Sequence, residues 1–192
     1  MSTYGAAYLQ WAPFAAENAE TAEALPKLGT PMNLGALNKV VDAPNVTEVT
    51  ADGDNRVQDS LSEFLGGTVD VDITELDNPV AAALYGAEQA GEGEDLAFGV
   101  DDEAPYGSLA FYVNKVKGKK KFYQGIYYPK LKAVLQGSEH NTRAKAGITL
   151  TGGKLHFNWE APLFGKYLYK SAPLNTEAEA KAWVDEKIKA ST

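Results

Sequence analysis

The chain has 192 residues, of which 44% are hydrophobic and 23% charged, and a formal net charge of −8. This length and composition are typical of a globular protein that buries its own core. The absence of cysteine excludes disulfides, thiolate metal sites and cysteine nucleophiles. The first residues lack the basic and apolar regions of a signal peptide, so we expect synthesis and folding in the cytoplasm.

The charge is divided unevenly along the chain. Residues 1–110 carry 20 acidic and 3 basic side chains, a net charge of −17, and residues 111–192 carry 6 acidic and 15 basic side chains, a net charge of +9. This division indicates a nucleic-acid or protein partner. It also allows copies of one chain to attract each other head to tail.

The N-terminal third predicts little regular structure. Residues 1–32 are rich in Ala and are interrupted by Pro and Gly, which predicts an arm with a short helix at 15–24. The runs 45–51 and 56–63 flank a turn-rich sequence, which predicts either a hairpin or a long loop between strands.

The clearest strand covers residues 66–73. Val69, Val71 and Ile73 alternate with Thr68, Asp70 and Asp72, which is typical of a sheet with one buried and one solvated face. A short helix follows, opened by Asp77-Asn78-Pro79 and ended by Gly86. Its expected buried stripe consists of Val80, Ala83, Leu84 and Ala87.

The second half predicts two hairpins and a helix. Runs 106–116 and 122–135 flank Lys117-Gly118-Lys119, and runs 146–151 and 154–159 flank Gly152-Gly153. Thr176 and Glu179 form a capping box at the start of a helix over 176–190. We therefore expect a mainly β fold, a β-sandwich or small barrel over 33–170, with one short internal helix, an N-terminal arm at 1–32 and a C-terminal helix within 171–192.

No catalytic or cofactor-binding constellation is marked by spacing. Neither His140 nor His156 has a second ligand at metal-binding spacing, and no nucleophile-elbow, zinc-protease or phosphate-loop motif occurs. The sequence around 52–55 resembles the start of a calcium loop but lacks its later ligands, so a solvated turn is favoured over a looser calcium site. We expect a protein that is not an enzyme and that has no cofactor or metal.

A basic cluster lies among aromatic residues near the second hairpin turn, at Lys115, Lys117, Lys119, Lys120 and Lys121. Such a cluster is compatible with nucleic-acid binding, but it is also typical of a hairpin tip that stays soluble. The acidity of the whole chain favours an acidic protein partner over DNA.

The order of these pieces resembles the major tail proteins, or tail tube proteins, of long-tailed, non-contractile bacteriophages. The resemblance covers about residues 30–160. It rests on TADGDN at 50–55, GGTVDVDI at 66–73, DNP at 77–79 before a helix ending LYG at 84–86, YGSLAFY at 106–112, the Lys-rich hairpin, and YYP at 127–129.

The resemblance implies a tail tube fold and an assembly. Six subunits would form a ring whose inner strands join into one barrel, and stacked rings would form the tube that conducts DNA during ejection without binding it specifically. The expected partners are other copies of the chain and the tape-measure, tail-tip and tail-terminator proteins. No membrane partner is expected, and the expected location is the virion tail, with assembly in the cytoplasm of the bacterial host.

Three groups of residues are the expected assembly sites. Thr68, Asp70 and Asp72 are expected to face the lumen, although an ordinary solvent face is equally compatible with the pattern. The turn at Asp52, Gly53, Asp54 and Asn55 is expected to contact the next ring. Lys117, Lys119, Lys120 and Lys121 are expected at a subunit contact.

Two other functions stay open. One is the tube protein of a contractile tail or secretion system. The other is a carbohydrate-binding β-sandwich in which Tyr123, Tyr127, Tyr128 and Trp159 stack on sugars, although core packing is the favoured role of these rings.

Overall fold

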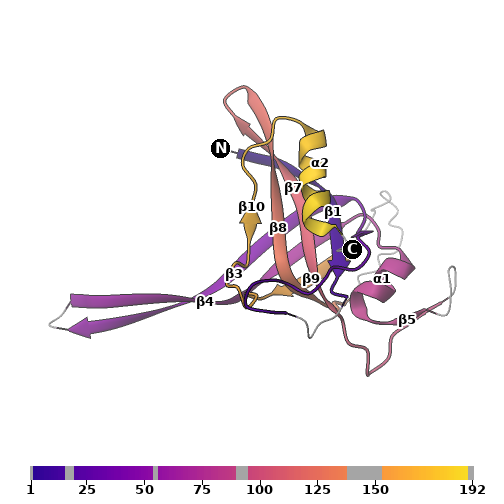
Figure 1. Ribbon diagram of the computed structural model, residues 1–192, viewed down its shortest axis with the longest axis horizontal. Coiled ribbons are helices and arrows are strands. Elements are labelled where there is room, and N and C mark those ends of the chain that lie inside the picture. The colour runs from indigo at the N-terminus through magenta and orange to yellow at the C-terminus, as the bar shows by residue number, and fades with distance from the viewer. Residues whose placement is uncertain (1, 16–19, 54–55, 90–94, 138–152, 190–192) are drawn as a thin grey trace, which may run out of the picture.

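The fold is one curled antiparallel sheet with two helices (Figure 1). The computed structural model describes residues 2–15, 20–53, 56–89, 95–137 and 153–189. Eight strands pair in the order β2-β1-β7-β8-β9-β4-β3, with β10 beside β8, and β5 pairs with β6 separately. The elements are β1 (Ser2–Pro13), β2 (Met32–Asn33), β3 (Leu37–Gly53), β4 (Arg56–Ile73), α1 (Asn78–Tyr85), β5 (Glu88–Gln89), β6 (Leu96–Ala97), β7 (Tyr106–Lys117), β8 (Lys120–Val134), β9 (Gly153–Trp159), β10 (Tyr169–Lys170) and α2 (Glu177–Ile188).

The sheet curls around its main core. Strands β1 and β3 lie near opposite ends of the strand order, yet they contact each other, as expected for a strongly twisted sheet. The inner face carries the most fully buried side chains, among them Leu9, Val71, Phe157 and Trp159. Helix α1 packs on this core through Ala81, Leu84 and Tyr85. The eight larger-sheet strands thus form one curled, barrel-like sheet, and β5 and β6 form a small sheet of their own.

Helix α2 covers the outer face of β1, β7 and β8. Strand β7 is therefore buried on both faces and reads as the nearly continuous apolar run LAFYV. Strand β9 has no such cover, and its side chains alternate between buried and more exposed positions. The outer face is thus divided into a part under α2 and an open part on β9, β4 and β3.

Local sequence signals are confirmed where they were strong. The segment 45–63 is a hairpin, and the Lys-rich turn joins β7 to β8. Val69, Val71 and Ile73 are fully buried. Helix α1 begins after Asp77 with Pro79 in its first turn and ends at Gly86, which has a φ of 70°. The capping box joins Thr176 and Glu179 as expected.

The expectation of an N-terminal arm is wrong for residues 2–13. They form β1, which pairs along most of its length with β7, because burial of Leu9, Trp11 and Ala12 outweighs the weak strand preference of an Ala-rich segment. Residues 20–24 are not helical, and 16–19 lie outside the described residues.

Two further expectations concern the buried face of α1 and the segment before β9. The expected stripe of α1 is confirmed in part: Leu84 is fully buried, and Val80 and Ala83 pack against the core while only partly buried. Ala81 and Tyr85, which were not expected, complete the buried face, whereas Ala87 is half-buried. The strand expected at 146–151 and the turn at Gly152 lie outside the described residues.

Candidate assembly surfaces

Thr68, Asp70 and Asp72 lie on the open part of the outer face. In the paired strands Thr68 lies opposite Ala43 and Asn158, Asp70 opposite Val41 and His156, and Asp72 opposite Lys39 and Lys154. Asp70 is exposed, whereas Thr68 and Asp72 are half-buried. The structure therefore brings the three residues expected at the lumen onto one solvated strip.

The strip is mixed in charge rather than uniformly acidic. Asp70 Oδ1 lies 2.6 Å from His156 Nδ1, and this contact becomes an ion pair when the imidazole is protonated. Asp72 has a lysine on each neighbouring strand. Opposite charges on adjacent strands typically stabilise a sheet by about 0.2–1 kcal/mol per pair. The two aspartates thus have basic cross-strand neighbours of their own chain.

A second surface is the outer part of the β3–β4 ribbon, which extends beyond the body (Figure 1). Its base is anchored by aromatic rings: Phe64 stacks on Tyr167 with ring centroids 3.9 Å apart, and both rings lie against Trp159. Beside these rings, at the base of the ribbon, Val46 lies opposite Phe64, and Val46 and Leu65 are 46% and 58% exposed. A two-stranded ribbon with both faces in water is marginally stable on its own. This ribbon therefore has the character of a segment that packs on another molecule.

The turn expected at a ring contact lies at the tip of this ribbon. Asp52 pairs with Val57 and Gly53 with Arg56, whereas Asp54 and Asn55 lie outside the described residues. The sequence had left the ribbon as a hairpin or a loop, and nothing in the sequence indicated that it would project.

A third surface is the turn between β7 and β8. Lys117 and Lys120 form the closing pair, and Gly118 adopts a left-handed φ of 62°. Lys117, Lys119, Lys120 and Lys121 are all exposed. Lys115 is set apart from them, because its Nζ donates to Gln124 Oε1 on the neighbouring strand.

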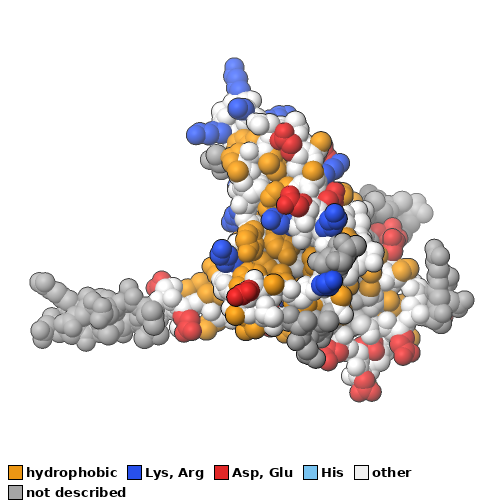
Figure 2. Space-filling view, in the orientation of Figure 1, with side chains coloured by type: hydrophobic (Ala, Val, Ile, Leu, Met, Phe, Trp, Pro, Cys, Tyr) orange, Lys and Arg blue, Asp and Glu red, His pale blue; other side chains and the backbone are white. Residues whose placement is uncertain are grey.

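The opposite end of the body is acidic. Around α1 and the segment after β6, the exposed residues include Glu75, Asp77, Glu88, Asp95 and Asp101. Figure 2 shows blue side chains at the hairpin end and red ones near the other end. The charge division along the sequence thus becomes a division in space.

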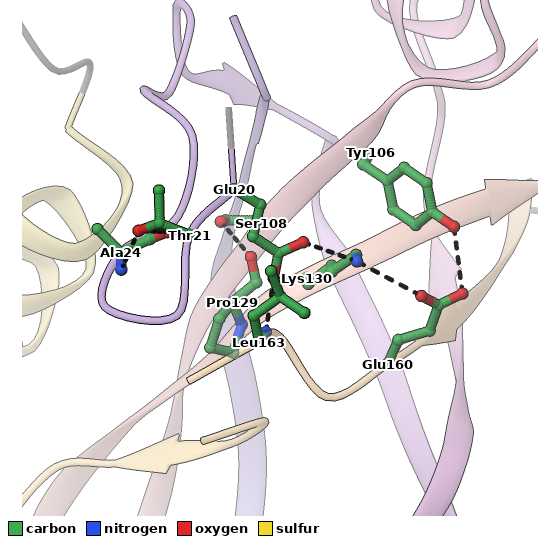
Figure 3. A network of polar contacts seen from close by, with 9 residues as sticks. All are labelled: Glu20, Thr21, Ala24, Tyr106, Ser108, Pro129, Lys130, Glu160 and Leu163. Atoms are coloured by element: carbon green, nitrogen blue, oxygen red, sulfur yellow. Dashed lines mark hydrogen bonds and ion pairs between the residues drawn. The ribbon is translucent and has the colours of Figure 1, made fainter. Parts of the chain in front are cut away.

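A partly buried polar network ties the segment after β1 to β8 (Figure 3). Lys130 Nζ lies 2.9 Å from Glu20 and 3.7 Å from Glu160, and Glu20 also accepts from the backbone N–H of Leu163. Burial by itself lowers the pKa of Lys130, but the hydrogen bond and attraction to Glu20 and Glu160 raise it above its ordinary value. Tyr106 donates to Glu160. Sequence reasoning missed this network, whose members are far apart in the chain.

A pocket of about 640 Å³ lies between α2, the bulge in β1 and the start of β3. Tyr8 has a φ of 61° at this bulge, and its hydroxyl donates to Asp185 on α2. Tyr112 donates to Glu177; burial raises the pKa of Tyr112, and the hydrogen bond to this carboxylate raises it further. These side chains attach α2 to the sheet.

Metal and sugar binding receive little support from the described residues. Within them no group of three His, Cys, Asp or Glu residues is arranged to hold a metal ion. His140 lies outside them. Tyr127, Tyr128 and Trp159 are buried and Tyr123 is half-buried, so the rings considered for sugar stacking serve mainly in packing. In the same part of the chain no helix is both long enough and apolar enough to cross a membrane.

Comparison with known proteins does not identify a family. No protein-family model and no curated protein matches the chain.

Proposed function

We propose that the chain is a structural subunit that assembles into hexameric rings, which stack into the tail tube of a long-tailed, non-contractile bacteriophage. In this role it is not an enzyme. It belongs to the virion tail, is assembled in the host cytoplasm, and surrounds the DNA during ejection without binding it specifically. The tape-measure, tail-tip and tail-terminator proteins are its further partners.

The projecting β3–β4 ribbon is the observation that carries this proposal. Two strands extend outside the body without a third strand beside them, the base of the ribbon exposes Val41, Val46 and Leu65, and packing on neighbouring subunits would cover both. Strand β3 is also an edge of the sheet, with Pro44 at a position that an edge accepts. Edges and a protruding ribbon suit an assembly made by strand addition.

The separation of charge supports a head-to-tail arrangement. A heterologous contact needs two unlike surfaces on each subunit, and the lysine turn and the acidic end provide them. In this arrangement Thr68, Asp70 and Asp72 remain our candidates for the lumen face. The mixed charge of their strip gives DNA neither a strongly attractive nor a strongly repulsive wall.

Electron microscopy tests the proposal directly. Purified protein at high concentration, with and without a tail-tip complex as nucleator, is examined in negative stain for rings and tubes. Tubes of regular axial repeat support the proposal. A protein that stays monomeric even with the nucleator contradicts it.

The second candidate is the tube protein of a contractile tail or secretion system. The same surfaces would serve there, so geometry does not separate the two. A sheath protein that binds the outside of the assembled tube would favour this candidate over the first.

A further inference from the structure

The segment after β6 exposes apolar side chains between acidic ones. Val100 is 100% exposed and Phe98 is 49% exposed. Asp95 and Asp101 are exposed on either side of them, and the side chain of Asp102 accepts the backbone N–H of Gly99 at 2.7 Å, which shapes the loop. A valine with no cover beside a half-exposed phenylalanine is typical of a contact surface.

A groove of about 580 Å³ lies on another part of the surface, where the curled sheet stops short of closing. Its walls are the first residues of β1, the first residues of β3 and the inner faces of β7 and β8. The apolar side chains of the lining are Ala6, Val40, Phe111, Val113 and Ile126, and its uncharged polar ones include Thr3, Asn38 and Gln124. Within the described residues, β1 from Ser2 to Tyr8 pairs only with β7, and β3 pairs only with β4. Each wall therefore presents a strand edge to the groove.

The rim of the groove is mainly basic. Lys39, Lys115 and Lys170 line it, against Asp42 as the acidic residue of the described lining. Lys115 lies on β7 close to the lysine turn. The β7–β8 hairpin points away from the end of the body where α1 and β5 lie (Figure 1). The molecule thus carries an acidic segment with exposed apolar side chains and, on another part of its surface, a groove with apolar walls and a mainly basic rim.

We propose that Phe98 and Val100 of one copy insert into the β1–β3 groove of the next copy, with Asp95 and Asp101 beside the lysines of its rim. The inserted loop would lie beside the edges of β1 and β3, whose backbone groups, unpaired within the described residues, are available to hydrogen-bond to it. The occupant is a second copy of this chain, because the charge and apolar character of the loop match those of the groove, and the two lie on separate parts of one molecule. This inference rests on the proposed function, since it specifies one contact of the assembly.

Disulfide trapping tests the contact. Because the chain has no native cysteine, only the introduced cysteines can form disulfides. Full-length Val100→Cys and Val40→Cys proteins are mixed under mild oxidation over a range of concentrations. The control pair is Val100→Cys with Lys166→Cys, at an exposed position outside the groove lining. Docking raises the local thiol concentration, so the mixed dimer should form at least about tenfold faster than in the control.

A charge variant strengthens the test. Asp101→Lys in the Val100→Cys protein should slow trapping, and added salt should slow trapping of the parent pair because exposed charges are screened. Circular dichroism confirms that each variant is folded.

The outcomes separate this contact from the function itself. Tubes in the microscope without trapping above the control overturn the contact but leave the tube function standing. Trapping without tubes supports the contact and counts against the tube function. Neither tubes nor trapping at the highest concentration contradicts both.

Discussion

Trp183 on α2 lies directly over Gly125 on β8. A Cβ atom placed on Gly125 would come within 2.1 Å of Trp183 Cε3, well inside van der Waals contact. The glycine is therefore required by the close approach of the helix to the sheet. Because α2 buries Ala180, Val184 and Ile188 on the same face, this contact helps to fix the whole C-terminal helix.

Gly125→Ala should destabilise the fold. The added methyl group forces the indole or the helix to move, and overpacking of this kind typically costs about 1–3 kcal/mol. Urea unfolding followed by circular dichroism measures the loss. Gly137→Ala is the matched control, since a Cβ there meets nothing within 4 Å. Equal free energies of unfolding for the two variants would show that Trp183 on α2 does not pack closely on Gly125.

The free energy of unfolding should fall in acid, partly because the carboxylate of Glu177 becomes protonated. Lys181 and Tyr112 donate to its carboxylate and lower its pKa below the ordinary 4.5. A depressed folded-state pKa stabilises the protein above pH 4.5, and this contribution is lost as the pH falls through the lowered value. Glu177→Gln should therefore lower Tm near neutral pH and converge with the parent in acid. Glu186→Gln, exposed on the same helix, is the control for general charge effects.

Shortening the β3–β4 ribbon should abolish assembly without unfolding the subunit. Residues 48–62 are replaced by Asn-Gly, so that the neighbouring pair of Thr47 and Glu63 closes a tight turn. Phe64, Val69 and Val71, which contribute to the inner core, are retained. Thermal unfolding should stay close to that of the parent, while tubes disappear from negative-stain images. Normal tubes from the shortened protein would show that the ribbon is not needed for assembly.

Reversing the lysine turn should slow assembly. The triple change of Lys119, Lys120 and Lys121 to Glu leaves the core untouched, because these side chains are exposed. Repulsion from the acidic end of the next copy should then replace attraction. Light scattering should show that the variant assembles more slowly than the parent. Added salt should raise the assembly rate of the variant, because it screens repulsion, and should lower that of the parent, because it screens attraction. An unchanged rate and salt response would place the turn away from every subunit contact.

Asp72→Lys should cost more stability than Asp72→Asn. The lysine would stand between Lys39 and Lys154 on the two neighbouring strands, and like charges directly opposite each other destabilise a sheet by up to about 1 kcal/mol. Chemical unfolding compares the two variants. If the strip lines the tube, phage that carry the folded Asp72→Asn subunit should build tails but deliver DNA less efficiently, because the strip becomes more basic. Unchanged infectivity would place Asp72 outside the lumen.

Signals carried by neighbouring residues predicted most of the fold. The Lys-Gly-Lys turn, the Thr176 capping box and the alternation of Val69, Val71 and Ile73 are local features that specify a hairpin, a helix start and a strand face. The position of β1 was not predictable in this way. Its Ala-rich sequence has a weak local preference, and its role depends on pairing with β7, which lies about a hundred residues later.

The candidate sites likewise include some features that local sequence predicts and others that depend on long-range pairing. The exposure of the lysine turn follows from the hairpin itself. The mixed charge around Asp70 and Asp72 depends on β9 pairing beside β4 in one register, which places His156 and Lys154 next to them. No periodicity within 66–73 contains that information. The projection of the ribbon likewise depends on where the body of the sheet ends.

The pairing of β1 with β7 has a consequence for biosynthesis. A ribosome adds about 5–20 residues per second, so β1 emerges several seconds before the strand that completes its pairing. During that interval Leu9 and Trp11, fully shielded in the finished protein, remain accessible to chaperones and to other nascent chains. The subunit therefore closes its core late in synthesis, and translation speed between residues 14 and 117 becomes a determinant of its yield.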